Sequence, residues 1–498
     1  MQATGKCHDV LIVGAGLSGI GTAVHILRDC PWADVALVEM RKELGGTWSL
    51  FRYPGVRSDS DMFTLGYDFK PWTGANSIAA GTEILAYLRE TAIEYNVLPR
   101  ISYGKRVVRA HWSKEEAQWS VEIQCADTNT LSLRKCRFLF MAAGYFSYKG
   151  GHRPDFPGEQ DFTGQILHPQ AWPHEFDWAN KRVAVIGSGA TAITLVPALA
   201  RLAKRVSMIQ RSPTYIAAVP LRAKLANVVR HLLPPRVAYA FMRACNIAFN
   251  YFFYKVSRTF PKFMARVLLA GVRNQLPSTN VERDWTPSYR PWDERLCAVP
   301  DGDLFEAIRN GHAEVVTGKI DHFFAEGIRM ADGRMVPADV VITATGLTLN
   351  FLGDIDLSVN GQPIKGEQRI IYKGCMLDGV PNLAYAFGYT NASWTLKIDL
   401  TARWLARLLN YMHKHCFQVV TPVRAPGIDV EQAIALKSEY IQRAASILPK
   451  QGKKRPWRSH DNYILDWWEL TKLALHDDVL QFKKASMFDA SSGEANGT

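Results

Sequence analysis

The sequence lacks closely spaced cysteines and long uncharged apolar runs, and each absence excludes a class of protein. Its eight cysteines form no C-x-x-C pair and no set with histidine at zinc spacing, so we expect a reducing compartment and no metal site. No stretch of about 18 apolar residues is free of charge, so no membrane-spanning helix is expected. The longest candidate, residues 237–254, contains Arg243. No signal peptide precedes the first apolar run, which predicts a cytoplasmic protein.

Acidic residues are absent from one long stretch. Between Trp178 and Val281 there is no Asp or Glu but there are 16 Lys or Arg, within a chain whose net charge is +12. A phosphate-rich ligand, an anionic membrane or a nucleic acid would each suit such a field. No zinc-finger spacing or RNA-binding aromatic motif accompanies the charge, so we expect no nucleic acid as a partner.

A glycine-rich turn follows the first apolar strand. HDVLIVGAGLSGIG places Gly14, Gly16 and Gly19 in the spacing G-x-G-x-x-G, where glycine permits a tight turn, the approach of a pyrophosphate and close packing of the next helix. The following strand, DVALVEM, ends at Glu39, whose carboxylate suits the ribose hydroxyls of a dinucleotide. Because strand, turn, helix, strand and acid arrive in order, we predict a dinucleotide site.

The residues after Glu39 favour FAD at this first site. The stretch RKELGGTWSLFRYPG is rich in glycine and aromatic residues, among them Gly46 and Trp48, and would enclose a second ring system. The β-rich runs at 138–146 and 339–349 end in small-residue turns that let the chain pass close to a cofactor. An ordinary buried strand is the alternative interpretation of both runs.

A second glycine-rich turn lies in RVAVIGSGATA. Gly187, Gly189 and Ala192 form the G-x-G-x-x-A variant, and the next strand ends at Arg211 instead of an acid. An arginine pairs with the 2′-phosphate of NADP(H), which a carboxylate would repel. The sequence therefore predicts an NADP(H) site here. Pro197 falls inside the expected helix and should kink it.

These patterns predict an α/β fold with two Rossmann-like dinucleotide-binding domains, for FAD and NADP, and a helical insert. For 498 residues we expect about two to four domains. We divide the chain into five segments. The FAD domain comprises residues 1–150 and, with C-terminal helices, residues 351–498. The NADP domain comprises residues 151–220 and 291–350, and the insert between its two parts comprises residues 221–290.

The insert concentrates basic and apolar residues. Residues 221–273 are rich in Leu, Phe, Tyr, Arg and Lys, and Pro234, Pro235 and Pro261 interrupt them, so we expect several short amphipathic helices. Two interpretations stay open. The insert is a helical lid with a solvated basic rim, or it binds peripherally to an anionic membrane at the inner face of the cell membrane.

The cysteine pattern also bears on the electron acceptor. Flavoenzymes that exchange dithiols and disulfides need paired cysteines beside the flavin, and this chain has neither C-x-x-C nor C-x-x-x-x-C. Molecular oxygen is then the expected acceptor. The nucleotide motifs alone do not define the reaction, because reductases share them.

The stretch FTGQILHPQAWP resembles the fingerprint of a known family. It matches F-x-G-x-x-x-H-x-x-x-W-P of type I Baeyer–Villiger monooxygenases through Phe162, Gly164, His168, Trp172 and Pro173. A second signature of that family, G-x-W-x-x-x-x-[FY]-P-[GM]-x-x-x-D, is matched by Gly46, Trp48, Tyr53, Pro54, Gly55 and Asp59. The resemblance extends along nearly the whole chain.

The resemblance implies a reaction and its partners. Such enzymes use NADPH to reduce FAD, form a C4a-peroxyflavin with molecular oxygen, and insert one oxygen atom next to a ketone carbonyl to give an ester or lactone. Sulfides and thioamides are expected as further substrates. Two alternatives remain: a flavin-containing N- or S-hydroxylating monooxygenase, against which Trp172 argues, and a redox-sensing flavoprotein without catalysis.

The resemblance also implies residue roles. Arg295, in PWDERLC, is similar to the family's active-site arginine, and Asp59 is similar to its acidic partner near the flavin. Without the resemblance, Arg295 is a surface ion-pair partner of Asp293 or Glu294, and Asp59 a turn or capping residue. Glu294 departs from the family, because some members carry a lysine there that helps to hold the 2′-phosphate.

The fingerprint is expected to couple the domains. His168 has the side chain of a catalytic base, but no nucleophile accompanies it in the sequence. In the family this segment links domain movement to the flavin site, so we expect Phe162, Gly164, His168 and Trp172 to form a rigid connector between the two nucleotide domains.

Overall fold

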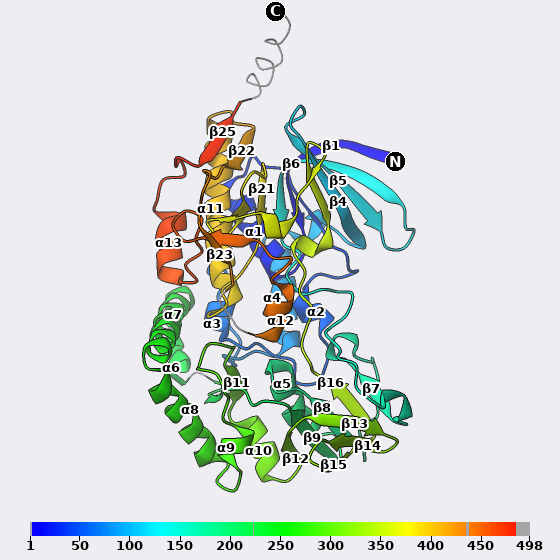
Figure 1. Cartoon of the computed structure of the whole chain (residues 1–498). Coiled ribbons are helices and arrows are strands. Elements are labelled where there is room, and N and C mark those ends of the chain that lie inside the picture. The colour runs from blue at the N-terminus through cyan, green and yellow to red at the C-terminus, as the bar shows by residue number, and fades with distance from the viewer. Residues whose placement is uncertain (1, 223, 435–437, 485–498) are drawn as a thin grey trace, which may run out of the picture.

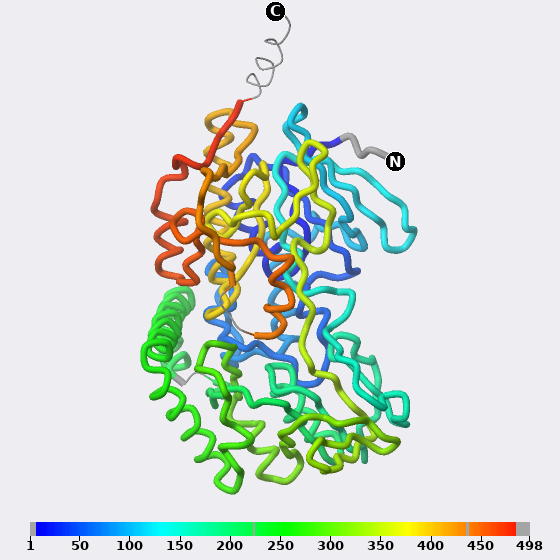
Figure 2. The backbone as a smooth tube through the Cα atoms, in the orientation of Figure 1, coloured from blue at the N-terminus to red at the C-terminus, as the bar shows by residue number. Residues whose placement is uncertain are grey.

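The structure is a computed structural model that describes residues 2–222, 224–434 and 438–484. Two separate β-sheets organise two lobes, one in the upper and one in the lower half of the molecule (Figures 1 and 2). The chain begins in the upper lobe, builds the lower one, and returns to the upper lobe after residue 350 (Figure 2). This double crossing brings residues of both lobes together between the sheets.

The upper lobe contains the larger sheet, in the order β18-β17-β4-β5-β6-β1-β2-β3, with β21 also paired to β6. β1, β2, β3, β6 and β21 pair in parallel, while β4, β5 and β6 form an antiparallel meander. Its strands are β1 (Gln2–Val13), β2 (Val35–Val38), β3 (Ile101–Ser102), β4 (Lys105–Ser113), β5 (Gln118–Cys125), β6 (Leu131–Met141), β17 (Asp356–Val359), β18 (Gln362–Pro363) and β21 (Leu383–Tyr385).

Helices pack on this parallel part because its strands are apolar on both faces. Val10, Leu11 and Ile12 of β1 are fully buried, which is typical of a strand covered on both sides. α1 (Leu17–Asp29) packs on β1 and β2, α4 (Gly81–Glu94) and α11 (Trp394–Lys414) pack on α1, and α13 (Tyr463–Thr471) packs on α11.

The lower lobe contains a five-stranded, wholly parallel sheet in the order β12-β9-β8-β16-β7. The strands are β7 (Gln165–Leu167), β8 (Arg182–Ile186), β9 (Arg205–Gln210), β12 (Ala313–Thr317) and β16 (Val340–Thr343), with α5 (Ala190–Leu199) and α10 (Asp303–Arg309) beside them. Each lobe thus has a strand, a glycine turn and a helix in Rossmann order, so the predicted α/β fold with two such units is confirmed. Pro197 lies in α5, which ends two residues later.

The insert consists of α6 (Lys224–Leu232), α7 (Pro235–Thr259) and α8 (Pro261–Gln275). The expectation of only short helices is wrong for α7, which has 25 residues. Pro235 and Pro261 each occupy a first helical position, where a missing N–H loses no hydrogen bond, so they start helices and interrupt none. Within the part of the chain that the structure describes, no helix has the length and apolar character needed to cross a bilayer.

Candidate active site

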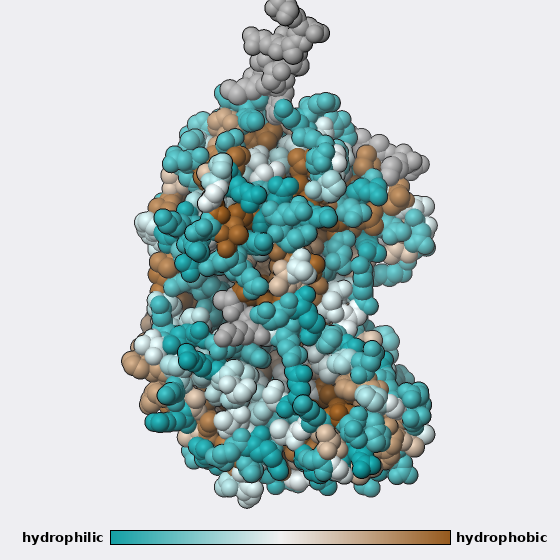
Figure 3. All heavy atoms as spheres, in the orientation of Figure 1, coloured by the Kyte–Doolittle hydropathy of each residue, from teal (hydrophilic) through white to brown (hydrophobic). Residues whose placement is uncertain are grey.

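A cavity of about 1240 Å³ lies between the two lobes. Its walls include Gly14 and Gly16 of the first turn, Gly187 and Gly189 of the second, and Arg295. In the space-filling view the outline of the molecule narrows between the two lobes (Figure 3). Both predicted dinucleotide sites therefore open into one continuous space.

The first glycine turn is shaped to receive a pyrophosphate. Gly14 has φ +106°, and a Cβ there would lie 2.5 Å from the Ala142 carbonyl oxygen. A Cβ on Gly19 would lie 1.9 Å from the Gly14 oxygen, so only glycine allows α1 to pack this closely. Gly16 is the N-cap of α1 and makes no side-chain cap, which leaves the first N–H groups of the helix directed to the cavity.

Glu39 fixes the end of β2 beside this turn. Its carboxylate accepts hydrogen bonds from the N–H groups of Ala15 at 2.7 Å and of Arg41 at 2.8 Å. Burial raises the pKa of Glu39, although these hydrogen bonds act in the opposite direction. The Glu39 side chain lines the cavity.

A narrow aromatic channel continues from the first turn. Gly46 has φ +55° and its backbone approaches that of Gly16, because a Cβ on Gly46 would lie 3.1 Å from the Gly16 Cα. Trp48 lines the cavity nearby. Tyr145 and Trp394 stack at 5.0 Å between ring centroids and also line it, which suits a planar ring system.

The second turn repeats this geometry in the lower lobe. Gly187 has φ +141°, and a Cβ there would lie 2.3 Å from the Ala344 carbonyl oxygen. Gly189 is the N-cap of α5, and nothing stands within 4 Å of a Cβ built on it, so its surface is open to the cavity. Ala192 is fully buried and packs inside the lobe, away from the cavity wall.

Arg211 lines the cavity at the end of β9 and pairs with Glu439. Both side chains are 65% exposed, so a phosphate can displace the carboxylate at small cost. Glu439 begins α12 (Glu439–Ala444), far away in sequence. Burial raises the pKa of nearby Glu294, and the charge of Glu439 raises it further.

The predicted catalytic pair is brought together across the lobes. The Arg295 Nη1 donates to the Asp59 Oδ2 at 2.7 Å, and both residues line the cavity. Burial lowers the pKa of Arg295, but the charge of Asp59 and the phenols of Tyr145 and Tyr440 outweigh it and raise the pKa above its ordinary value. The neighbouring acid Asp293 pairs with Arg258 at 2.6 Å.

The segment 53–59 of the upper lobe contacts the lower lobe at every second residue. Tyr53 packs against Trp172, and a Cβ on Gly55 would lie 2.9 Å from the Thr194 oxygen of α5. Arg57 pairs with Asp303 at the start of α10, and Asp59 pairs with Arg295. The segment turns at Gly55, which has φ +79°, and presents these four residues to the lower lobe.

The fingerprint residues lie outside the cavity wall. The rings of Phe162 and Phe323 lie 6.0 Å apart between centroids. A Cβ on Gly164 would lie 2.3 Å from the Asp339 carbonyl oxygen. Residues 165–167 form β7, the edge strand beside β16. This stretch is therefore built into the lower sheet.

Of the last two fingerprint residues, Trp172 contacts the upper lobe and His168 contacts neighbouring loop residues. The His168 Nδ1 accepts the Gln170 N–H at 3.2 Å, and its ring packs on Gly151. Burial lowers the pKa of His168. The Trp172 ring stacks on that of Trp178, with 5.4 Å between the ring centroids, and packs against Tyr53, with 6.3 Å between the centroids. His168 does not touch Arg295 or Asp59, so the structure brings it to no reacting group.

Sequence reasoning missed several residues of the cavity. Tyr145 and Trp394 lie within segments whose strand or helix character was expected, but nothing in the sequence marked their side chains. Glu439 and Tyr440 follow positions 435–437, which lie outside the described residues, and no motif announces them. Asp303 is the first residue of α10, in a segment without any predicted role.

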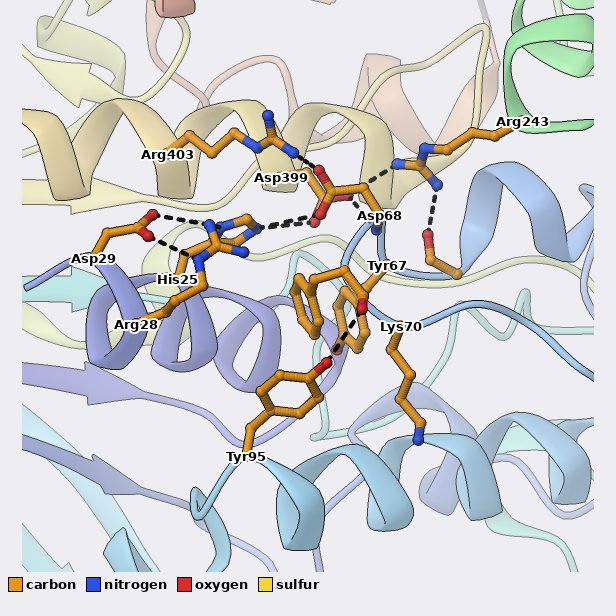
Figure 4. A network of polar contacts seen from close by, with 12 residues as sticks. His25, Arg28, Asp29, Tyr67, Asp68, Lys70, Tyr95, Arg243, Asp399 and Arg403 are labelled. Atoms are coloured by element: carbon orange, nitrogen blue, oxygen red, sulfur yellow. Dashed lines mark hydrogen bonds and ion pairs between the residues drawn. The ribbon is translucent and has the colours of Figure 1, made fainter. Parts of the chain in front are cut away.

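One cluster among the described residues brings together side chains of the kind that bind metals. His25, Asp68 and Asp399 place ligand atoms within 4.8 Å of one another. Arg243 already contacts Asp399 at 2.9 Å, and Arg403 pairs with Asp68 (Figure 4). Two guanidiniums neutralise these carboxylates and repel a metal ion, so we assign no metal here.

Comparisons with known proteins match this architecture. A family model described as flavin-binding monooxygenase-like matches residues 68–275, and a model for NAD(P)-binding Rossmann-like domains matches residues 12–71. The FAD-containing monooxygenase EthA of Mycobacterium tuberculosis is 46% identical over 480 residues, which cover 96% of this chain and 98% of that protein. EthA of Mycolicibacterium smegmatis is 45% identical, with 96% and 97% covered.

Solved structures are similar in fold. A steroid monooxygenase bound to NADP superposes with a TM-score of 0.75 at 22% identity, covering 96% of this chain and all of that one. A cyclohexanone monooxygenase bound to epsilon-caprolactone superposes with a TM-score of 0.74 at 19% identity, covering 97% of this chain and all of that one. These likenesses establish the two-lobed arrangement.

Proposed function

The chain belongs to the family of FAD-containing, flavin-binding monooxygenases, and we propose that it inserts one atom of molecular oxygen next to a ketone carbonyl, giving an ester or lactone. NADPH and FAD are its cofactors, and oxygenation of sulfides is a side activity. The observation that carries the proposal is the Arg295–Asp59 pair, held between two dinucleotide turns in one cavity.

The residues of the cavity fit both cofactors. Gly14, Gly16 and Gly46 leave a bare backbone channel that a Cβ would fill, and Glu39 ends it with a carboxylate suited to ribose. When bound there, FAD supplies the oxygen-activating ring system and NADPH supplies the hydride that reduces it. We assign the adenine end of FAD to this turn and its ring system to the aromatic wall of Tyr145 and Trp394.

The second turn is assigned to NADPH. Gly187 and Gly189 present the N-terminus of α5 to a pyrophosphate, and Arg211 binds the 2′-phosphate by displacing Glu439. Lys319 also lines the cavity and adds positive charge. Because Glu294 brings a negative charge where a lysine would help, the preference for NADPH depends mainly on Arg211.

Arg295 is assigned the stabilisation of negative charge that develops on oxygen during insertion. A guanidinium keeps its charge in a poorly solvated site, and donors placed in advance at a developing oxyanion lower the barrier. Asp59 holds the guanidinium in place through the 2.7 Å hydrogen bond.

Domain coupling is proposed to run through the fingerprint. Trp172 contacts Tyr53, and Tyr53 belongs to the segment that carries Asp59. Movement of the lower lobe would thus reach the catalytic pair through one short segment. His168 serves as a fixed part of this connector and not as a base.

The proposed partners are a small ketone or sulfide and molecular oxygen, with no nucleic acid. We place the protein in the cytoplasm, with peripheral contact between residues 221–273 and an anionic membrane. The basic, acid-free composition of this insert supports that contact.

The test is product analysis with purified, FAD-loaded protein. With NADPH, a panel of cyclic, aryl and long-chain ketones, and ¹⁸O₂, we expect an ester or lactone that carries one ¹⁸O atom. NADPH oxidation without any ester from the panel would contradict the proposal. Oxygenated sulfides or amines in the absence of ester would instead identify an N- or S-hydroxylating enzyme.

A further inference from the structure

We propose that the outward faces of α6, α7, α8 and α13 form one surface that lies on an anionic lipid bilayer. The inference rests on the membrane contact proposed for the insert and extends it to the C-terminal helix α13. The four helices follow one another along one side of the molecule, the left side in Figure 1.

Exposed large apolar side chains are concentrated on this surface. The described residues include 24 exposed large apolar side chains. Twelve of these 24 lie between Leu225 and Val267, and four lie on α13. Every exposed phenylalanine and tryptophan of the described residues belongs to these sixteen. On the face turned to the viewer in Figure 3, by contrast, hydrophilic residues dominate and apolar ones come in small groups. A concentration of exposed large apolar side chains on neighbouring helices indicates an interaction site.

The outward stripes have helical spacing. On α6, Leu225, Val228 and Leu232 are exposed at intervals of three and four residues. On α8, Phe263 and Val267 repeat this at an interval of four. A surface helix normally turns such a stripe inward, so these helices are built to meet a second apolar phase.

α7 carries apolar side chains on both faces, since it buries Ala238, Tyr239 and Met242 and still exposes phenylalanines. Phe241 and Phe252 are 48% and 68% exposed, while Arg243, between them in sequence, is 7% exposed. The Arg243 Nη2 donates to the Asp399 Oδ2 at 2.9 Å, and its Nη1 donates to the carbonyl oxygens of Phe63 and Gly66 at 2.9 and 2.7 Å (Figure 4). Rotating α7 to hide its phenylalanines would leave this buried pair broken, so the orientation is fixed.

The charge of the surface selects an anionic partner. Arg236, Lys262 and Arg266 are exposed and have no ion-pair partner among the described residues. There is no Asp or Glu between Trp178 and Val281. A second copy of the chain would bring these cations against their own kind, whereas anionic headgroups neutralise them.

α13 extends the surface with interfacial aromatic residues. Trp467 and Trp468 are 38% and 47% exposed, with Lys472 over the first ring and Arg455 over the second. Tryptophan beside cations is typical of the headgroup region of membranes. The buried pair Lys397–Asp466, at 2.8 Å, ties α13 to α11.

Both α7 and α13 are therefore fastened to the same helix. Asp399 of α11 receives Arg243 of α7, and Lys397 of α11 receives Asp466 of α13. Since no helix of the described residues can span a bilayer, the surface lies in the interface and does not cross it.

The lipid-facing helix also contacts the segment that carries Arg295. At its C-terminal end, Phe253 and Tyr254 of α7 contact the Trp292 ring, and the Arg258 Nη1 donates to the Asp293 Oδ1 at 2.6 Å. A bilayer at this surface would thus hold apolar ketones, which partition into lipid, close to the enzyme.

Vesicle sedimentation of the FAD-loaded, full-length protein tests the surface. We expect pelleting with phosphatidylcholine–phosphatidylglycerol vesicles, little with phosphatidylcholine alone, and release at high salt. Phe241→Asp/Phe252→Asp should lower partitioning more than tenfold. Neutralising Arg236, Lys262 and Arg266 to Gln should lower it about fivefold for each cation. The matched control, Leu131→Asp/Met335→Asp, changes exposed apolar residues elsewhere and should pellet like the unchanged protein.

Two further readouts separate the outcomes. Trp467→Ser/Trp468→Ser should weaken vesicle binding and reduce quenching of tryptophan fluorescence by brominated lipid. Ketone oxidation in lipid-free buffer should be unaltered in all these variants, so a loss of binding is distinct from a failure of the proposed reaction. Absence of pelleting, equal pelleting with neutral vesicles, or self-association that Phe241→Asp/Phe252→Asp abolishes would overturn the proposal.

Discussion

At the scale of single residues, the ion-pair partner of a charged side chain determines its role. Arg295 lies next to two acids in sequence yet pairs with Asp59, 236 positions away. Asp293 pairs with Arg258, while Arg295 lines the cavity and pairs with Asp59 across the lobes. We propose that the Arg295 guanidinium there stabilises negative charge on oxygen.

Replacing Arg295 tests this placement. Arg295→Ala should lower the rate of ester formation about 10²–10³-fold, the usual effect of removing one oxyanion donor. The rate of Arg295→Lys should lie between that of Arg295→Ala and that of the unchanged protein. Gas chromatography of the ester gives the rate. FAD content and anaerobic reduction by NADPH serve as controls and should be largely retained, because neither depends on oxygen. An undiminished ester rate in Arg295→Ala would remove the mechanism proposed here.

Glu439 is predicted to compete with the 2′-phosphate for Arg211. Glu439→Gln should tighten NADPH binding about two- to fivefold, the scale of an exposed ion pair, and leave NADH binding unchanged. Arg211→Ala should weaken NADPH binding and again spare NADH. Fluorescence titration with both nucleotides gives the dissociation constants. Equal effects of Arg211→Ala on NADPH and NADH would show that Arg211 does not read the 2′-phosphate.

At the scale of elements, buried polar contacts fix the orientation of a helix that has apolar side chains on both of its faces. α7 exposes phenylalanine and buries Arg243, because Asp399 and two backbone oxygens of the upper lobe receive the guanidinium. The Tyr239 hydroxyl adds a hydrogen bond to the Tyr67 oxygen at 3.0 Å. The insert therefore lies between two parts of the lower lobe in the sequence, but its side chains anchor it to the upper lobe.

Removing one partner of this anchor should destabilise the protein strongly. Arg243→Met leaves Asp399 buried without its guanidinium, which costs about 3–5 kcal/mol. Arg243→Met/Asp399→Leu should recover part of the loss, because an apolar pair replaces the ionic one. Thermal unfolding followed by circular dichroism gives the shift in Tm. Arg236→Met, exposed on the same helix, is the control and should change little; a similar Tm for both single variants would refute the anchor.

At the scale of the whole molecule, one short segment joins the two lobes at the cavity. Residues 53–59 place Tyr53, Gly55, Arg57 and Asp59 against four different parts of the lower lobe. The Arg57–Asp303 pair is largely buried, with side chains 15% and 16% exposed. It holds the loop of Asp59 against the lobe that supplies Arg295.

Breaking that pair should loosen the catalytic contact without removing it. Arg57→Ala and Asp303→Ala should each lower kcat and raise the KM for NADPH together, as expected for a joint between domains. A double-mutant cycle should give a coupling of about 1–3 kcal/mol. Glu306→Gln, exposed on the same helix α10, is the matched control. Additive effects of the two single variants would exclude a direct link.

Much of the fold could be predicted because its signals are local. Gly14 and Gly187 have left-handed φ values and no room for a Cβ, so each glycine turn is written in a few consecutive residues. The change from Glu39 to Arg211 at the equivalent strand end is likewise readable without a structure. The length of α7 was not, since Pro235 and Pro261 mark where helices begin but do not show that residues 235–259 form one helix.

The sequence by itself determined the two nucleotide turns, the α/β fold and the family, because these depend on backbone conformation and spacing within short segments. Only the tertiary structure decided which charges meet. Asp59 with Arg295, Arg57 with Asp303 and Glu439 with Arg211 are pairs between distant segments. The physical reason is that an ion pair is defined by distance in space, and the packing of two lobes sets that distance where no local pattern can.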